Sequence, residues 1–96
     1  MTFNWNFEKN QILIKQRNIS FETIEKYIID DCLVDILINN KKKEYEHQII
    51  MLVLIDDYIW EVPSVITQND PMVIFLITAF PSRKENKKYW RNKNEN

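Results

Sequence analysis

Hydrophobic side chains recur at helical spacing in the first part of the chain. From Asn6 to about Asn18 they fall three, four or seven residues apart, a pattern that predicts an amphipathic helix. Asn6 has the side chain of a helix N-cap, and basic residues near the far end suit the negative pole of the helix. The residues expected along the buried stripe of this helix are Phe7, Asn10 or Gln11, Leu13 and Ile14.

A second helix is predicted from Phe21 to about Ile29, with Ser20 as its cap. Its apolar side chains fall on one stripe at spacings of three and four. The acidic pair Asp30-Asp31 interrupts the pattern and is expected to end the helix. The stripe consists of Phe21, Ile24 and Ile28.

Four apolar runs follow, and each has the length of a strand. The second run has no polar residue, so we expect a central strand that is covered on both faces. Pro63, in the third run, lacks a backbone N–H, so we expect it at a sheet edge, a bulge or the strand end. The predicted strands are Cys32 to Ile38, Ile49 to Ile55, Tyr58 to Ile66 and Met72 to Phe80.

The order of elements indicates the fold class. A last helix, capped by Ser82, is predicted from Arg83 to about Arg91. Because the helices are segregated from consecutive strands, the pattern predicts an α+β fold: two N-terminal helices, a four-stranded, mainly antiparallel sheet with helices on one face, and a C-terminal helix. Ninety-six residues suffice for one domain. We expect residues 1–90 to form it and residues 91–96 to be a flexible basic and Asn-rich tail.

The chain contains no glycine. Tight turns must therefore use Asn and Asp, which tolerate left-handed backbone better than other residues with a Cβ atom. The absence of glycine also excludes the Gly-rich loops that bind dinucleotides and nucleoside triphosphates. The candidate turns are Asn39-Asn40, Asp56-Asp57 and Asn69-Asp70.

Charge is distributed unevenly along the chain. Residues 1–82 carry 7 basic and 12 acidic side chains, a net charge of −5, whereas residues 83–96 carry 6 basic and 2 acidic ones, a net charge of +4. A basic end on an acidic body favours a localised anionic partner, although a short solvated basic tail has the same composition.

The start of the chain and its apolar runs bear on location. Met1 is not followed by a basic and then an apolar region, so no secretory signal is expected. The longest apolar run, Ile49 to Ile55, is far shorter than the stretch of about 20 residues that a membrane helix needs. We therefore expect a cytoplasmic protein without a membrane partner.

The chain offers few residues for metal binding or nucleophilic catalysis. His47 is the only histidine and Cys32 the only cysteine, whereas such sites need several convergent ligands or a base with an orienting partner. The acidic pairs fall at predicted turns, and the run Lys41 to Lys43 is diluted by the acidic residues that follow it. We therefore expect no metal and no cofactor.

The last predicted helix interleaves basic and aromatic residues. Cationic charge beside aromatic surface is what proteins use to neutralise RNA phosphates and to stack bases. The alternative, which the pattern leaves open, is that the aromatic rings pack on the sheet while the cations stay in water. Lys15 and Arg17 close the first helix and would join these cations if that helix lay beside them. The residues of the last helix concerned are Arg83, Lys84, Lys87, Lys88, Tyr89, Trp90 and Arg91.

Three segments together resemble one protein family. Phe3 to Asn10 has an aromatic-x-Trp opening followed by Glu-Lys and Asn, Arg17 to Glu22 has a basic helix end, a turn and Ser-Phe-Glu, and Ile77 to Lys84 with Lys88-Tyr89 forms a strand end and a basic segment. These segments resemble the BrnT-like toxins of bacterial toxin–antitoxin pairs over roughly residues 3–90. The family usually has Gly in the turn where Asn18 stands, and often an Arg in the last strand where this chain has Phe75.

The resemblance implies a RelE-like fold and a toxin of a type II toxin–antitoxin system. Such a toxin is an endoribonuclease, an mRNA interferase that inhibits translation at RNA or the ribosome, and it forms an oligomer with a DNA-binding antitoxin from the neighbouring gene. The ribose 2′-OH of the RNA is the nucleophile, and the protein supplies cations and a proton donor or acceptor. Arg83 and Tyr89 are then the candidate catalytic residues. The candidate RNA-binding residues are Lys15, Arg17, Lys84, Lys87 and Lys88.

Two other functions remain compatible with the same residues. Phe75 in place of a strand Arg, together with the acidic body, favours a non-catalytic module of the same fold that only binds an antitoxin. A nucleic-acid binder that does not cleave its ligand is the third hypothesis. For an interaction module, the candidate interface residues are Trp5, Trp60 and Trp90, although core packing is the more frequent role of Trp.

Overall fold

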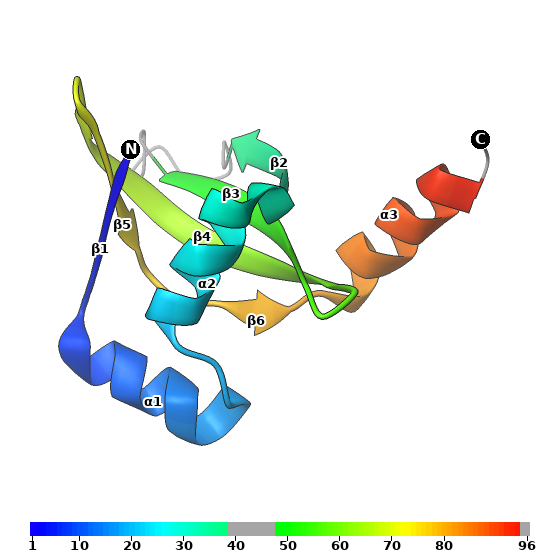
Figure 1. Ribbon diagram of the computed structural model, residues 1–96, viewed down its shortest axis with the longest axis horizontal. Helices are drawn as coiled ribbons and strands as arrows, with labels where there is room; N and C mark the ends of the chain where they lie inside the picture. Colours follow the sequence, from blue (N-terminus) through cyan, green and yellow to red (C-terminus); the bar gives the residue numbers. More distant parts are fainter. Residues whose placement is uncertain (39–47, 95–96) are drawn as a thin grey trace.

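The computed structural model describes residues 1–38 and 48–94, and confirms the α+β class with two N-terminal helices and a C-terminal one. Asn39-Asn40, Lys41 to Lys43 and His47 lie outside the described residues. The elements, shown in Figure 1, are β1 (Thr2–Trp5), α1 (Phe7–Arg17), α2 (Phe21–Tyr27), the π-helical turn η1 (Ile28–Cys32), β2 (Leu33–Ile38), β3 (Gln48–Ile55), β4 (Tyr58–Asn69), β5 (Met72–Leu76), β6 (Phe80–Pro81) and α3 (Arg83–Asn94).

The sheet has more strands than the four predicted. Its order is β1-β5-β4-β3-β2, and the short β6 pairs with β4 beside this path. All neighbours are antiparallel except β1, which runs parallel to β5. The prediction missed β1 because four residues are too few to show a period. The first strand and the last long strand therefore lie side by side (Figure 1).

Pro63 explains why the single strand expected from Met72 to Phe80 is two strands. β4 pairs with β5 from Ser64 onward and with β6 at Trp60 and Glu61, so Pro63 faces the interruption between them. Its carbonyl accepts a hydrogen bond from the Ile77 N–H at 2.9 Å. Because the N and O atoms of one residue in an antiparallel strand point to the same side, the missing N–H faces the interruption too. Pro63 thus lies inside β4, where no ladder bond is lost, and not at the edge, bulge or strand end that was expected.

Capping residues define both ends of α1, and the one at the start, Asn6, was predicted. The side chain of Asn6 accepts from the Lys9 N–H at 2.9 Å. Asn18 ends the helix in the left-handed conformation (φ 55°, ψ 38°), and its N–H donates to the Ile14 carbonyl. Asn is one of the few residues with a Cβ atom that enter this region readily.

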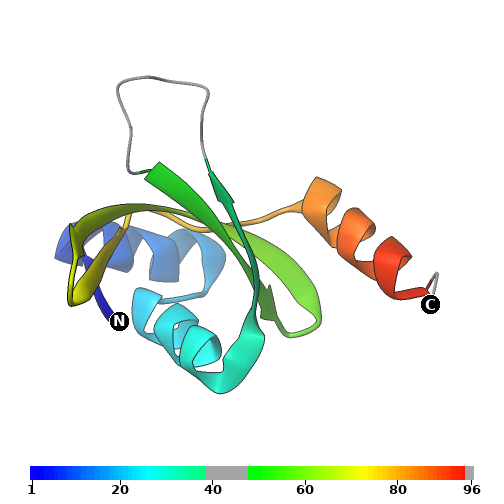
Figure 2. The same cartoon turned by 90° about the horizontal axis from the view of Figure 1, so that it is seen from above.

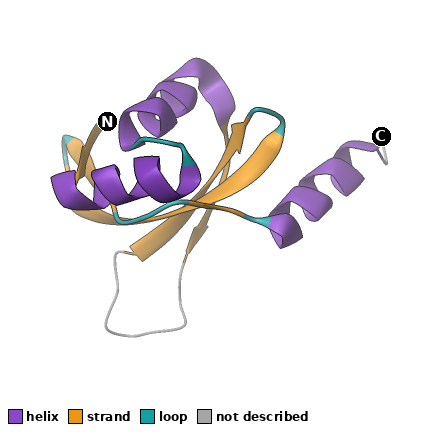
Figure 3. Cartoon of the chain, turned by 90° about the horizontal axis from the view of Figure 1, so that it is seen from below, coloured by secondary structure: helices purple, strands orange, loops and turns teal. Residues whose placement is uncertain are grey.

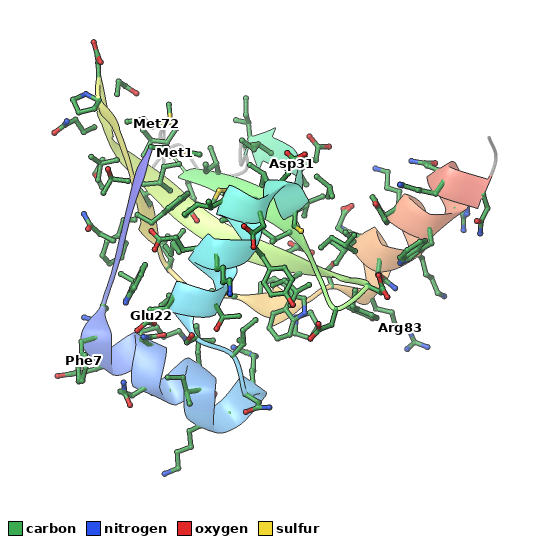
Figure 4. All side chains as sticks on the ribbon, viewed as in Figure 1. Met1, Phe7, Glu22, Asp31, Met72 and Arg83 are labelled. Carbon is green, nitrogen blue, oxygen red and sulfur yellow. The ribbon has the colours of Figure 1, made fainter. Side chains whose placement is uncertain are left out.

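The predicted buried stripe of α1 is wrong in part. Phe7 is 72% and Ile14 is 42% exposed, whereas Asn10 and Leu13 are buried. Figure 4 shows Phe7 on the outside of the molecule. Asn10 is buried because it joins α1 to α2: its Oδ1 accepts from the Phe21 N–H at 2.8 Å and its Nδ2 donates to Glu22 at 2.6 Å. The stripe position that the pattern left to Asn10 or Gln11 is therefore filled by Asn10, and Gln11 is exposed.

The apolar core lies between the sheet and the two N-terminal helices. Figure 2 shows α1 and α2 together on one side of the sheet, and Figure 3 shows them in front of it from below. The predicted stripe of α2 is confirmed, since Phe21, Ile24 and Ile28 are all buried. The strand side chains that they meet are Met51, Val53, Val62, Ile74 and Leu76.

Among the residues that the structure describes, only α3 covers the opposite face of the sheet, and it does so at one end. Alternation along β3 and β4 places Leu52 and Ile59 on this face, and both are buried where α3 begins. Ile50, Val65 and Phe75 lie on the same face and are half-buried. The expectation that all helices share one face is therefore wrong for α3, and β3 is fully covered on one face only.

Asp residues form the tight β-hairpin, as predicted from the absence of glycine. Asp56 and Asp57 connect β3 to β4 with φ values of 49° and 64°, and two successive positive φ angles are the signature of a type I′ turn. Asp31 also has a positive φ, 71°, and lies inside η1, which extends to Cys32. At the next hairpin Asn69 still belongs to β4, so the turn consists of Asp70 and Pro71.

Candidate functional site

Five basic residues of α3 form one continuous surface, which we call the basic strip. Spacings of three and four residues place them on one side of the helix, and all five are exposed. The only acidic residue of α3 is Glu85, which is 7% exposed. Within residues 83–94, exposed cations are thus not balanced by an exposed carboxylate. The basic strip consists of Arg83, Lys84, Lys87, Lys88 and Arg91.

Polar contacts attach the start of α3 to the sheet. The Ser82 hydroxyl caps the helix by accepting from the Glu85 N–H at 3.2 Å, and it donates to Glu61 of β4 at 2.6 Å. The Asn86 side chain accepts from the Ile59 N–H at 3.0 Å. These bonds position the helix so that Arg83 lies on the outside of the molecule, as Figure 4 shows.

The aromatic residues of α3 face the body of the protein. Trp90 donates its indole N–H to the Asp57 carbonyl at 3.3 Å and to Asn86 at 3.1 Å. The Tyr89 ring meets the Trp90 ring edge-on, with 5.1 Å between centroids and 83° between planes, and the Lys93 ammonium lies 5.6 Å from the Tyr89 centroid. In this structure the rings pack inward while the cations of the basic strip remain in water.

The two candidate catalytic residues lie on different sides of α3. Arg83 and Tyr89 are six residues apart, which on an α-helix separates their directions by about 120°. Tyr89 lines a cavity of about 210 Å³ between α3 and the sheet, together with Leu52, Glu85 and Lys88. Lys88 therefore belongs to the basic strip and also lines this cavity.

The cations of α1 are not part of the basic strip. In Figure 1, α1 lies below the sheet whereas α3 extends from its far end. Lys15 is exposed on α1, and Arg17 is held by a hydrogen bond from its Nη1 to the Ala79 carbonyl at 3.2 Å. The cations of α1 and those of α3 therefore form two separate basic regions and not the single patch that was considered.

A larger cavity, which we call the aromatic cavity, lies on the α1–α2 side of the sheet. Its volume is about 540 Å³. The Tyr27 hydroxyl donates to Asp56 Oδ1 at 3.0 Å. This hydrogen bond to the carboxylate, with burial as the second cause, raises the pKa of Tyr27 above its ordinary value of 10.0. The charged and aromatic residues that line the cavity are Arg17, Tyr27, Asp56, Tyr58 and Trp60, and the polar residues Asn18 and Thr23 line it as well.

The sequence analysis missed this cavity as a site, although it named Arg17 and Trp60 for other reasons. One signal was present, since Tyr58 and Trp60 alternate along a predicted strand and so share a face. The contributions of α1 and α2 had no such signal, because Arg17 and Tyr27 approach Asp56 only through the packing of the helices on the sheet.

The three Trp residues have three different environments. Trp5 stacks on Phe21 with 5.8 Å between centroids and 29° between planes. Trp60 lines the aromatic cavity, and Trp90 is bonded to the β3–β4 turn. The structure therefore does not gather them into one surface.

The geometry of the described residues also bears on metal binding and on membrane insertion. Within the described residues, no three side chains of His, Cys, Asp or Glu gather so that they could hold a metal ion. None of the helices in residues 1–38 and 48–94 has both the length and the apolar character needed to cross a bilayer.

No protein-family model, no curated protein and no solved structure matches this chain. What the surface can do chemically follows from the geometry above. The basic strip can neutralise a row of phosphates. The aromatic cavity offers ring surface, one guanidinium and one carboxylate to a small planar ligand.

Proposed function

We propose that the chain is the toxin of a bacterial type II toxin–antitoxin pair and an endoribonuclease that inhibits translation by cleaving mRNA. The observation that carries this proposal is the basic strip, in which exposed cations follow one side of α3 and the only acidic residue of the helix is buried. On an otherwise acidic chain, such a strip localises a phosphate backbone to one helix.

Arg83 and Tyr89 are the candidate catalytic residues. The RNA supplies its own 2′-OH as nucleophile, and Arg83 stabilises the negative charge that develops on the phosphorus centre. Tyr89 exchanges a proton with the substrate from the cavity side of α3. Because the two side chains diverge by about 120°, the substrate must bend across the first turns of α3 to meet both.

The remaining cations position the RNA. Lys84, Lys87 and Lys88 hold successive phosphates along α3, and Lys88 also borders the cavity that contains Tyr89. Lys15 and Arg17, which lie on α1, contact a separate part of the RNA. In the cell the partner is an antitoxin encoded by the neighbouring gene, which binds DNA and forms an oligomer with the toxin.

Growth after induced expression in a bacterium tests the proposal. Wild-type protein is expected to arrest growth, and co-expression of the neighbouring gene is expected to relieve the arrest. Arg83→Gln is expected to restore growth and to lower RNA cleavage by the purified protein by roughly 10²-fold or more, as for the loss of a group that stabilises transition-state charge. Lys26→Gln, an exposed cation on α2, is the matched control and should leave both unchanged.

Two outcomes would contradict the proposal at different levels. Full toxicity of Arg83→Gln at equal protein abundance removes Arg83 from the site and leaves the toxin proposal in place. Normal growth with abundant, folded wild-type protein removes the toxin proposal itself.

A non-catalytic module that binds an antitoxin is the second candidate function, and one observation favours it. Phe75, Ile50 and Val65 form an apolar, half-buried surface on the face of the sheet that α3 leaves open. An apolar segment of an antitoxin would bury this surface. This function predicts a stable complex with the antitoxin, weakened by Phe75→Ser, and no RNA cleavage by the free protein.

A further inference from the structure

The aromatic cavity lies at the junction of α1, α2 and the β3–β4 hairpin. Arg17 comes from the end of α1, Tyr27 from the end of α2, and Asp56 and Tyr58 from the β3–β4 hairpin. Its volume of about 540 Å³ lies within the range of roughly 300–1,000 Å³ that is typical of small-molecule sites.

The walls of the cavity suit a flat aromatic ligand. Tyr58 and Trp60 lie two residues apart on the same face of β4, and both are half-buried. Each ring therefore keeps part of its surface exposed to the cavity. Base–aromatic stacking of this kind contributes about 1–3 kcal/mol per base.

The polar groups of the cavity are held in place by the protein. The Nη1 atom of Arg17 donates to the Ala79 carbonyl at 3.2 Å, and a guanidinium has further N–H donors that suit an anion. Asp56 accepts from the Tyr27 hydroxyl at 3.0 Å, and a carboxylate has about four acceptor sites. Both groups can thus bind a ligand without losing their contacts to the protein.

The pair of charges selects the chemistry of the ligand. Arg17 repels a cationic ligand and attracts a phosphate. A carboxylate such as Asp56 accepts best from two adjacent N–H groups, and guanine presents its N1–H and its amino group side by side. Adenine and cytosine place a ring acceptor beside the donor, and uracil has one N–H between two carbonyls, so each offers the carboxylate a poorer edge.

We propose that the aromatic cavity binds a guanine nucleotide, with the base against Tyr58 and Trp60, its Watson–Crick edge on Asp56 and its phosphate on Arg17. The nucleotide is either free or an unpaired guanine within RNA, because the two share this chemistry. Arg17 is the one residue that this proposal shares with the proposed RNA-binding residues, because the basic strip lies on α3 and not at the aromatic cavity.

Titration of the full-length, ¹⁵N-labelled protein with 5′-GMP, AMP, CMP and UMP tests the proposal by NMR. GMP is expected to shift the amide resonances of Asp56, Tyr58 and Trp60 saturably, with an affinity about tenfold or more above that for CMP and UMP. A titration that does not saturate, or shifts confined to α3, would overturn the proposal.

Three variants separate a binding role of the cavity residues from a structural one. Asp56→Asn is expected to shift preference from GMP toward AMP, because an amide offers adenine both a donor and an acceptor. Arg17→Gln is expected to weaken the binding of GMP about tenfold and to leave the binding of guanosine unchanged, as loss of a phosphate contact requires. Asp57→Asn, in the same turn but outside the cavity lining, is the matched control. An unchanged preference between GMP and AMP in Asp56→Asn would refute the assignment of the base edge.

A single-stranded oligouridine with one internal guanosine distinguishes the two sources of the ligand. Tighter binding of this oligonucleotide than of GMP, with shifts at the aromatic cavity and at α3, supports a guanine within RNA. Tighter binding of GMP supports the free nucleotide. GMP binding without growth arrest would refute the toxin proposal alone. Growth arrest without GMP binding would refute only the proposal that the aromatic cavity binds a guanine nucleotide.

Discussion

The two faces of the sheet are made by the same strands and have opposite characters. The face beneath α1 and α2 is closed, with side chains such as Met51, Val62 and Ile74 almost entirely buried. Residues 1–38 and 48–94 cover the other face only where α3 begins, so that Leu52 and Ile59 are buried while Ile50 and Phe75 are half-exposed. Strand β3 thus contributes its odd-numbered residues to the core and its even-numbered residues to the open face.

The difference shows how a small chain divides its residues between stability and binding. The closed face carries most of the apolar burial, which is the main favourable contribution to folding. The open face and the rims of the sheet carry the groups that can meet a ligand: the basic strip on one side and the aromatic cavity on the other. Substitutions should therefore have different consequences according to the face they touch.

Truncating one isoleucine on each face of the sheet should give the largest difference in stability between the two faces. Ile74→Ala, at a side chain that is 1% exposed on the closed face, is expected to lower the free energy of unfolding by about 3–4 kcal/mol through lost burial and a cavity. Ile50→Ala, on the open face, is expected to cost about 1 kcal/mol. Urea unfolding of the two variants checks the difference, and equal losses would show that the open face is covered in solution.

The buried polar link between α1 and α2 should give the next largest effect. Asn10→Ala leaves the buried Phe21 N–H without its acceptor and Glu22 without its donor, so we expect a loss of about 2 kcal/mol in unfolding free energy. Gln11→Ala, at the exposed neighbouring position, should change stability by less than about 0.5 kcal/mol. Similar values for the two variants would refute the role given to Asn10.

The cap of α3 should have a smaller effect that is confined to the open face. Ser82→Ala removes the acceptor of the Glu85 N–H and the donor to Glu61, and we expect a loss of about 1 kcal/mol. Backbone hydrogen exchange should accelerate in the first turn of α3 and remain slow in α2. Ser82→Thr keeps the hydroxyl and should retain most of the protection; faster exchange throughout the molecule would show that the cap also supports the core.

The smallest expected effect concerns Tyr27, at the rim of the closed face. Its pKa is raised above 10.0 by the hydrogen bond to Asp56 and then by burial. Because the raised pKa favours the protonated phenol in the folded state, this stabilisation is present below pH 10 and is lost as the pH rises through the folded-state pKa. The stability difference between wild type and Tyr27→Phe should therefore shrink above that pH, as followed by urea unfolding. Parallel pH profiles would contradict the hydrogen bond.

The elements that sequence patterns predict best are those whose partners are close along the chain. The stripe of α2 and the turn at Asp56-Asp57 follow from local spacing and from the absence of glycine. β1 has too few residues to show a period, and the burial of Asn10 depends on its partners at Phe21 and Glu22. Local rules cannot indicate contacts that only the assembled fold creates.

The candidate site divides in the same way. The basic strip is a local feature, because residues three and four apart on a helix share a side. The inward direction of Tyr89 depends on the sheet beneath α3, and the aromatic cavity joins residues as far apart as Arg17 and Trp60. Both features required the packed structure.

The glycine-free turns have a consequence for the unfolded chain. Asn18, Asp31, Asp56 and Asp57 adopt positive φ angles with a Cβ atom in place, a conformation that costs most residues roughly 1–2 kcal/mol in the native state and costs Asn and Asp less. A chain without glycine also samples fewer backbone conformations when it is unfolded, so it loses less entropy on folding. The strain of the turns is thereby offset in the denatured ensemble, and replacing Asn18 by Gly would relieve the native state while enlarging the range of conformations that folding must eliminate.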